Sequence, residues 1–399
     1  MITKAVLVFW VLIYFVVSAG LMALVNWVSM RPWRRAEEAH WTEQARLLWP
    51  VRFTARFSLV MIPLMLQQLH WILDPTFMAD SNWLFLLYVG GVFGAIAGGY
   101  PLDRAIHAQV GFKSWFLTKL AIIGLGLGYW AAVVIAALLM PADFGWQMVA
   151  VTFGYIIGNA LFLWGAMLKY LRLLGFLKPA GPRLHRIVES RVARLGNVRV
   201  RATWQLGGPM ANAFAMTTTR ELLFSDRLLE ICDDDEVSAI CDHELAHLGE
   251  TKWVQLARIA GSYSMFPLIF VVPCFHHLGA FSPLYLFAIT FTIARLVKIL
   301  AQRMEKRADQ RAQNEEANEG VYAKALEKLY RDNLSPAVNV NNRQAHPHLY
   351  DRMVAAGITP EYPRPRRAKR LTWAGWVLIV LAFLSFMMMA MVAPPPPPN

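Results

Sequence analysis

The sequence predicts a mainly α-helical, polytopic membrane protein of about eight spans, with one water-exposed α+β domain that contains a small β-hairpin or sheet. The first supporting observation is composition. Apolar residues make up 56% of the 399 residues and charged residues only 17%, and the mean hydropathy is +0.38. The second is a series of long apolar runs separated by charged segments. The third is a mixed, basic region from Lys169 onward, where apolar residues recur with strand and helix periods.

The first expected span is the almost uninterrupted apolar run at residues 5–28. It is longer than the apolar core of a cleavable signal and long enough to cross a bilayer, so we expect it to be retained. The run at 57–73 is the weakest, because Gln67, Gln68 and His70 interrupt it, and it also fits a buried or tilted helix. The other expected spans lie at about 83–100, 116–140, 146–168, 261–278, 281–300 and 372–393.

The distribution of charge predicts the orientation. A formal net charge of +12 would suggest a nucleic-acid partner in a soluble protein. Here much of the Arg and Lys borders apolar runs, so we predict the lipid bilayer as partner and no nucleic acid. Segment 29–56 carries six arginines against three glutamates, which favours the cytoplasmic side, and the connections that follow alternate in charge. We therefore expect a multi-pass protein, of the inner or plasma membrane if bacterial, whose polar region faces the cytoplasm.

The polar region begins with short strand and helix signals. Residues 198–202 alternate apolar and basic, as in a half-exposed strand. Residues 212–216 and 221–225, joined by a Thr-rich turn, predict a hairpin whose first strand is a candidate open edge. The acidic cluster at 233–236 predicts a helix start, because carboxylates there cap free amide groups. We expect this helix to run on beyond Lys252 into the 261–278 span.

The helix that follows the acidic cluster contains His-Glu-x-x-His at residues 243–247. His243 and His247 stand four residues apart, so in a helix they project from one face and can share a zinc ion. Glu244 then points toward the open coordination position, where a bound water would have to lose a proton. The alternative is an ordinary helix with two surface histidines.

A catalytic zinc site needs a third protein ligand, and the expected membrane hairpin supplies a candidate. It returns the helix with Glu305 to the side of His243. Asp309, four residues further on, can accept a hydrogen bond from the second ring nitrogen of a ligand histidine. Alternatively, both acids belong to a solvated charged face with Arg303, Lys306 and Arg307.

Four segments together resemble the integral-membrane zinc metallopeptidases (gluzincins) that include the CAAX prenyl endopeptidase and the HtpX heat-shock protease. The segments occur in the family's order between about 180 and 355. They are Asn212-Ala213-Phe214-Ala215, His243-Glu244-Leu245-Ala246-His247, Glu305-Lys306-Arg307-Ala308-Asp309, and His346-Pro347 followed by Arg352.

The resemblance implies a zincin-like domain and a role for each matching residue. His243, His247 and Glu305 would hold one zinc ion, with Glu244 as general base. Asp309 would support a ligand histidine. The four residues 212–215 would bind an extended peptide through backbone hydrogen bonds. His346 and Arg352 would be a late active-site pair that stabilises the oxyanion; His346 is otherwise a turn residue before Pro347, and Arg352 a helix-face charge.

Five parts of the chain follow from these patterns. Residues 1–170 form an N-terminal membrane region of about five spans, and 171–260 a catalytic domain with the zinc-binding helix. Residues 261–300 form a transmembrane hairpin, with His276 and His277 expected in a loop at its far tip. Residues 301–371 are the second part of the catalytic domain. Residues 372–399 hold the last span and a tail with five prolines.

The predicted function is a membrane-embedded zinc endopeptidase that hydrolyses membrane-associated polypeptides. One alternative is a non-catalytic scaffold or transporter-like protein with a structural metal, which would not need Glu244. Another is a metal-responsive regulator, for which additional cytosolic clusters of Cys and His would be expected.

Overall fold

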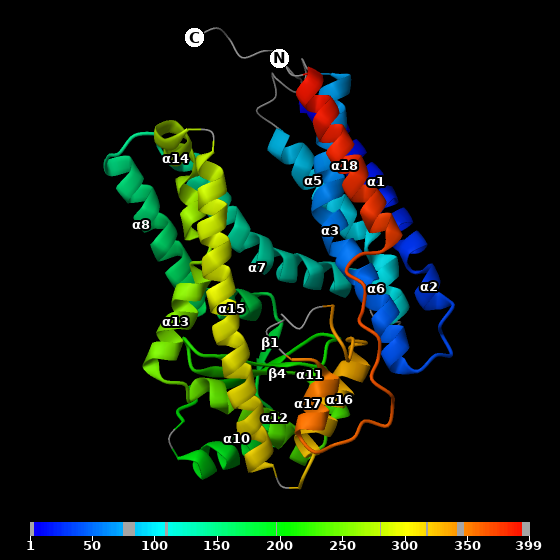
Figure 1. Cartoon of the computed structure of the whole chain (residues 1–399), viewed down its shortest axis with the longest axis vertical. Helices are drawn as coiled ribbons and strands as arrows, with labels where there is room; N and C mark the ends of the chain where they lie inside the picture. The colour runs from blue at the N-terminus through cyan, green and yellow to red at the C-terminus, as the bar shows by residue number, and fades with distance from the viewer. Residues whose placement is uncertain are drawn as a thin grey trace. The chain divides into compact units, whose positions relative to one another are not determined.

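The computed structural model describes residues 4–74, 84–107, 111–196, 198–279, 281–316, 318–340 and 347–392. The chain forms two compact units (Figure 1). The first contains residues 1–119, 334–340 and 364–399, and the second contains residues 120–333 and 341–363.

The first unit is a helical bundle. Gly94 and Gly98 of α5 lie directly against the backbone of α1, where a Cβ atom would collide with carbonyl oxygens, so the two helices pack closely. Tyr14 and His70 form one of the polar contacts inside the bundle. Tyr14 Oη lies 3.1 Å from His70 Nδ1, so His70 is a buried hydrogen-bond partner of Tyr14. The helices of this unit are α1 (Lys4–Ser29), α2 (Arg31–Arg34), α3 (Trp41–Leu73), α5 (Leu84–Gly98), α6 (Tyr100–Ile106) and α18 (Trp373–Val392).

The second unit contains a four-stranded sheet with the order β1-β2-β4-β3. Strands β2 and β4 are parallel, whereas β1 pairs with β2 and β3 pairs with β4 in antiparallel fashion. The predicted hairpin is therefore confirmed, and β3 is an end strand of the sheet among the described residues. The strands are β1 (Leu177–Pro179), β2 (Ala202–Leu206), β3 (Ala213–Met216) and β4 (Glu221–Ser225).

The predicted strand at 198–202 is wrong in its position. The strand runs from Ala202 to Leu206, where each residue has a partner in β4, beginning with Ala202 opposite Glu221. Val198 instead packs into the apolar core with α10. The short strand β1 was not expected, since it ends at Pro179 and is followed directly by Ala180-Gly181-Pro182, and proline and glycine are typical of turns.

Helices cover this sheet and extend beyond it (Figure 1). The structure gives α7 (Phe112–Leu139), α8 (Trp146–Leu161), a π-helical segment η1 (Phe162–Ala166), α9 (Met167–Leu173), α10 (Pro182–Leu195), α11 (Asp226–Ile231), α12 (Asp234–Leu248), α13 (Lys252–Ser262), a 3₁₀ segment η2 (Phe266–Phe270), α14 (Val271–Leu278), α15 (Ser282–Glu315), α16 (Val321–Asp332) and α17 (Leu349–Ala355).

Helix α12 starts as predicted but ends earlier. Asp233 and Glu236 form a reciprocal capping box, with Glu236 N–H donating to Asp233 Oδ1 at 2.9 Å and Asp233 N–H donating to Glu236 Oε2 at 3.0 Å. The expected continuation into the membrane segment is wrong, because α12 ends at Leu248 and a separate helix, α13, begins at Lys252. Gly249 caps α12, and the break lets Glu250 turn back toward His247.

Six helical segments among the described residues are long and apolar enough to cross a membrane. The protein is therefore a multi-pass membrane protein, although the count of about eight spans is not confirmed. The exposed side chains of α15 include Leu284, Phe287 and Phe291, as expected of a helix in contact with lipid. The six segments are Lys4–Ser29, Trp41–Leu73, Leu84–Ile106, Trp146–Leu173, Lys252–Leu278 and Ser282–Glu315, and the shorter apolar helix Trp373–Met389 follows them.

A buried ion pair fixes α12 within the second unit. Asp242, which is fully buried, accepts from Arg191 Nε of α10 at 2.8 Å and from a second guanidinium nitrogen. Arg191 also donates to the carbonyl oxygen of Glu315, at the end of α15, at 2.8 Å. One guanidinium thus ties together α10, α12 and α15, the last two of which carry the candidate metal ligands.

Arg191→Met is expected to lower the free energy of unfolding by about 3–5 kcal/mol, because it leaves the Asp242 carboxylate buried without its counter-charge. Thermal unfolding of the detergent-solubilised, chelated chain measures this. The matched control is Arg194→Met, since Arg194 is exposed where it pairs with the Glu315 carboxylate and donates to the Glu315 carbonyl oxygen at 3.3 Å, and its loss should cost less than about 1 kcal/mol. Equal destabilisation by the two variants would contradict the prediction.

Candidate metal centre

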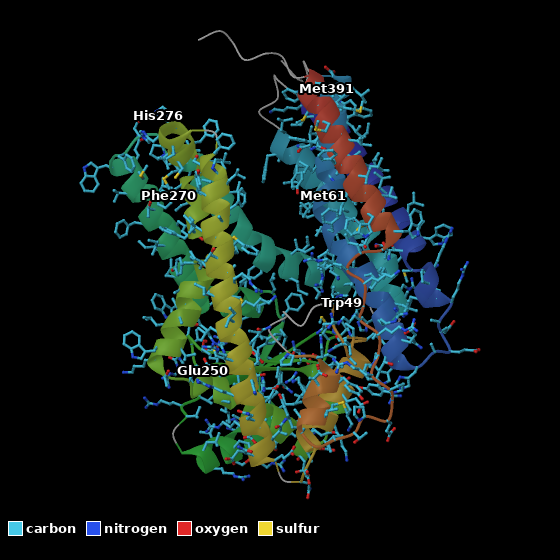
Figure 2. All side chains as sticks on the ribbon, in the orientation of Figure 1. Trp49, Met61, Glu250, Phe270, His276 and Met391 are labelled. Carbon is cyan, nitrogen blue, oxygen red and sulfur yellow. The ribbon has the colours of Figure 1, made fainter. Side chains whose placement is uncertain are left out.

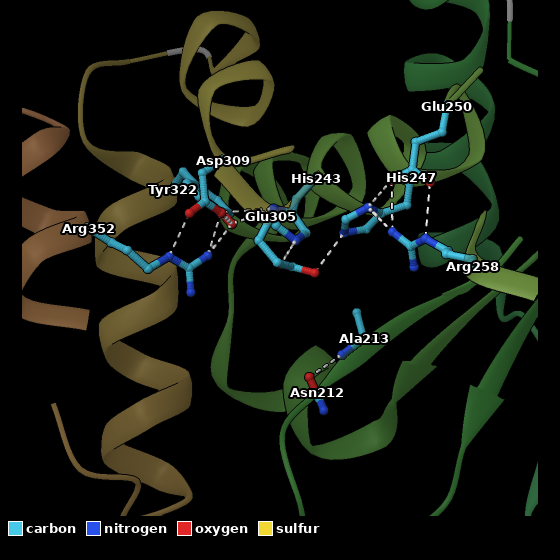
Figure 3. A network of polar contacts seen from close by, with 10 residues as sticks. All are labelled: Asn212, Ala213, His243, His247, Glu250, Arg258, Glu305, Asp309, Tyr322 and Arg352. Atoms are coloured by element: carbon cyan, nitrogen blue, oxygen red, sulfur yellow. Dashed lines mark hydrogen bonds and ion pairs between the residues drawn. The ribbon is translucent and has the colours of Figure 1, made fainter. Parts of the chain in front are cut away.

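Two imidazoles and one carboxylate converge between α12 and α15 (Figure 3). His243 Nε2 lies 3.5 Å from one oxygen of Glu305, and His247 Nε2 lies 3.5 Å from the other. The three side chains are buried, and their candidate ligand atoms all lie within 4.8 Å of one another. The structure therefore brings together the three residues that sequence reasoning selected as metal ligands.

The second ring nitrogen of His243 contacts a buried polar network (Figure 3). His243 Nδ1 lies 2.7 Å from Tyr322 Oη and 3.1 Å from Asp309 Oδ1. Tyr322 donates to Asp309 at 2.8 Å, and Arg352 donates to both of them. Tyr322 Oη can therefore accept from His243 Nδ1–H, a tautomer that leaves the Nε2 lone pair directed at Glu305.

The charges around His243 raise its affinity for a proton. Burial lowers the pKa of His243, but hydrogen bonds with Asp309 and Glu305 raise it to a net value of about 9. Burial also lowers the pKa of Arg352, while Tyr322 and Asp309 raise it to a net value above its usual range, so its charge persists. Since a metal ligand must be the neutral imidazole, a bound ion replaces a proton at His243.

A second carboxylate and arginine support His247. His247 Nδ1 lies 3.0 Å from Glu250 Oε1, and Arg258 donates to Glu250 at 2.8 and 3.1 Å. Arg258 also lies 3.0 Å from His247 Nδ1, but it carries only donors, so the Glu250 carboxylate is the acceptor for Nδ1–H. Each histidine thus has a carboxylate near its Nδ1, and each of these carboxylates is paired with an arginine.

Glu250→Gln is expected to weaken zinc binding by about 10–100-fold, because it removes the charged acceptor that fixes the His247 tautomer. A competition titration with a zinc indicator measures the affinity directly. The control is Glu189→Gln, which removes an exposed carboxylate on α10. An affinity unchanged in Glu250→Gln would show that this acceptor does not orient the ligand.

The other predicted site residues lie as follows. Glu244 is buried on α12, with 8% of its surface exposed. Asn212 immediately precedes β3, which contains Ala213, Phe214 and Ala215 and packs next to α12. Arg352 lies on α17, and its guanidinium donates to Asp309. His346 lies outside the described residues.

Sequence reasoning missed Tyr322, Glu250 and Arg258. Glu250 stands only three residues after His247, so this closeness in sequence is a signal once a partner for Nδ1 is sought. Tyr322 comes from α16, 79 residues from His243, and no local pattern indicates its contact.

A match to a peptidase family and the long apolar helices support a membrane metallopeptidase. Residues 180–357 match the model of peptidase family M48, and this segment contains every candidate ligand and supporting residue described above. No curated protein matches the chain. The predicted resemblance to this class of integral-membrane zinc metallopeptidases is confirmed.

A solved structure supports the fold of the whole chain. "Crystal Structure of S. mikatae Ste24p" aligns with a TM-score of 0.50 over 87% of this chain and 98% of that chain, with 14% sequence identity. The chain therefore has a Ste24p-like fold.

Proposed function

We propose that the protein is a zinc-dependent endopeptidase that hydrolyses peptide bonds of membrane-associated polypeptides. The observation that carries this proposal is the buried convergence of His243 Nε2, His247 Nε2 and Glu305, with each Nδ1 engaged elsewhere. Two imidazoles and one carboxylate are the ligands of a catalytic zinc site that keeps a position open. Their membership of the M48 segment adds support.

The donor set fits zinc. When bound, zinc supplies a Lewis acid that polarises the scissile carbonyl and acidifies a water molecule. Glu244, which follows His243 directly on α12, would accept a proton from that water and later donate it to the leaving amine. A structural metal site would have no use for such a base, so Glu244 favours catalysis over the scaffold alternative.

Arg352 and His346 would have different roles. Arg352 donates to Asp309 and Tyr322, so in this proposal it keeps Asp309 ionised and the His243 ring oriented. Because its guanidinium is engaged by Asp309 and Tyr322, this proposal does not assign Arg352 to the oxyanion. His346 stays the predicted donor to the oxyanion.

Strand β3 would bind the substrate in extended form. Ser225 N–H donates to Asn212 O at 2.9 Å, so the backbone groups of alternate residues, Phe214 and Met216, face β4. Those of Ala213 and Ala215 face away from it. The Ala213 N–H already donates to the Asn212 side chain at 3.0 Å, which leaves the Ala215 backbone as the main contact for an added strand.

A cavity of about 220 Å³ lies where β3 ends. Apolar residues and a few polar ones line it, as in a site for a substrate side chain. The lining residues are Phe162, Leu163, Met167, Ala215, Met216, Thr217, Thr218, Arg258, Ile259 and Ser262.

Ala215→Pro is expected to raise KM for extended peptides by about tenfold or more, because it removes one outward N–H worth about 1.5 kcal/mol without touching the β3–β4 hydrogen bonds. Cleavage kinetics with a fluorogenic peptide measure this. Ala215→Gly keeps the N–H and is the control. The prediction fails if both variants have the KM of the unaltered chain while zinc content is normal.

The decisive experiment combines metal analysis of the purified chain with a casein or self-cleavage assay. We expect about one tightly held zinc per chain, loss of cleavage after chelation, and recovery on adding zinc back. Cleavage that persists in fully chelated protein would overturn the proposal.

The proposed orientation places the metal centre on the cytoplasmic side, as the arginines of segment 29–56 favour. Single cysteines introduced into a Cys274→Ser background test this in intact cells. A cysteine at Lys178 should resist an impermeant thiol reagent, whereas one in the proline tail should react. The reverse labelling pattern would invert the topology.

A further inference from the structure

A second group of candidate metal ligands lies far from the first. His276 and His277 are in the last turn of α14, not in a loop as expected, and Asp143 belongs to the segment between α7 and α8. His276 and Glu250 lie near opposite ends of the candidate span Lys252–Leu278 (Figure 2). On the predicted topology this group faces the side of the membrane opposite the M48 site.

The spacing of these groups suits ligands of one ion. His276 Nε2 lies 3.7 Å and His277 Nε2 3.6 Å from the same oxygen of Asp143, Oδ1. Both distances are too long for direct hydrogen bonds. Two ligands of a tetrahedral zinc with bonds of about 2.0–2.1 Å stand about 3.3–3.4 Å apart, so a small closure of the group suffices.

The candidate site formed by His243, His247 and Glu305 has a similar geometry. There the two histidine rings are 4.9 Å apart with planes at 89°, and each Nε2 is 3.5 Å from a carboxylate oxygen. The rings of His276 and His277 are 4.8 Å apart with planes at 78°. The second group therefore repeats the ring arrangement and the nitrogen–oxygen spacing of the first, although its histidines are adjacent in sequence.

A stacking contact holds part of the second group in place. The ring of Phe144, the residue after Asp143, stacks on His277 with centroids 5.3 Å apart and planes at 23°. This contact fixes the imidazole beside the backbone that carries the carboxylate, which lowers the entropy lost when an ion binds. The group is thus more ordered than three independent surface side chains.

We propose that Asp143, His276 and His277 form a second metal site, for zinc or copper(II), that links the α7–α8 connection to the end of α14. Imidazole nitrogens with one carboxylate oxygen select borderline transition metals over magnesium or calcium. The side chains are exposed, Asp143 by 82% and His277 by 38%, so water completes the coordination and the ion exchanges with solution. The site is distinct from the M48 centre and does not depend on the proposed peptidase activity.

The test is a zinc titration of the full chain in detergent, in a His243→Ala background that disables the first centre. We expect one equivalent to bind, and His277→Ala and Asp143→Asn each to weaken it by more than about tenfold, since loss of even an outer hydrogen-bond partner costs that much. His185→Ala removes an exposed histidine of α10 and is the control that should change nothing. Thermal unfolding of the chelated variants checks that they are folded.

Copper(II) supplies an independent measurement in the same background. The electron paramagnetic resonance spectrum should show two imidazole nitrogens coordinated to copper. In His276→Ala it should show only one coordinated imidazole nitrogen. Zinc binding that is absent, or that is unaffected by both His277→Ala and Asp143→Asn, would overturn the proposal, as would a copper spectrum without imidazole coupling.

Discussion

Glu244→Gln is expected to reduce peptide cleavage by about 10²–10⁴-fold while zinc content stays that of the unaltered chain. Glutamine has nearly the same shape as glutamate but cannot accept a proton, so the substitution removes the base and keeps the packing on α12. The measurement is the cleavage rate of casein, or of a fluorogenic peptide, with zinc quantified in the same sample.

The matched control for this variant is Glu189→Gln, which changes an exposed carboxylate on α10 to an amide. It should cleave at the rate of the unaltered chain. If Glu244→Gln retains full activity with zinc bound, Glu244 is not the general base. The inactive variant is also a substrate trap, and peptides that copurify with it would define the sequence preference.

Glu305→Ala is expected to lose zinc altogether under conditions where the unaltered chain keeps about one ion. Removal of a direct ligand leaves only two imidazoles, and even the loss of an outer hydrogen-bond partner costs about 10–100-fold in affinity. Metal analysis after dialysis against a weak chelator measures this, and activity should disappear in parallel.

Gln310→Ala is the control for Glu305→Ala, because Gln310 is an exposed residue on the same helix. Circular dichroism of the metal-free proteins separates loss of the ion from loss of the fold. Normal zinc content in Glu305→Ala would assign the third ligand elsewhere. This result would leave the second proposed site unaffected, since that site shares none of these residues.

Much of the fold follows from the sequence because bilayer crossing imposes long apolar runs, which a composition scan detects. The helix start at Asp233 was equally accessible, since a capping box uses residues only three apart. The expected membrane hairpin made Glu305 a candidate ligand, because it has to return the chain to the side from which it left, and the resemblance to the metallopeptidases then favoured it over a charged surface residue.

The features that escaped prediction depend on tertiary contacts or on a local break in the chain. Tyr322 contacts His243 only because α16 folds against α12. The short strand β1 exists only because β2 offers it a partner. The approach of Asp143 to His276 and His277 joins segments more than 130 residues apart, so no spacing rule reveals it.

In the proposed peptidase, Arg258 would make substrate selectivity and metal retention difficult to alter independently. Its guanidinium orients Glu250, which holds a ligand histidine, and the same residue forms part of the cavity wall where β3 ends. A substitution at Arg258 that reshapes the cavity for a new substrate would therefore also loosen the ion. During evolution, or in directed selection, changes in preference would accumulate first at cavity positions without contact to the ligands, such as Met167 and Thr217.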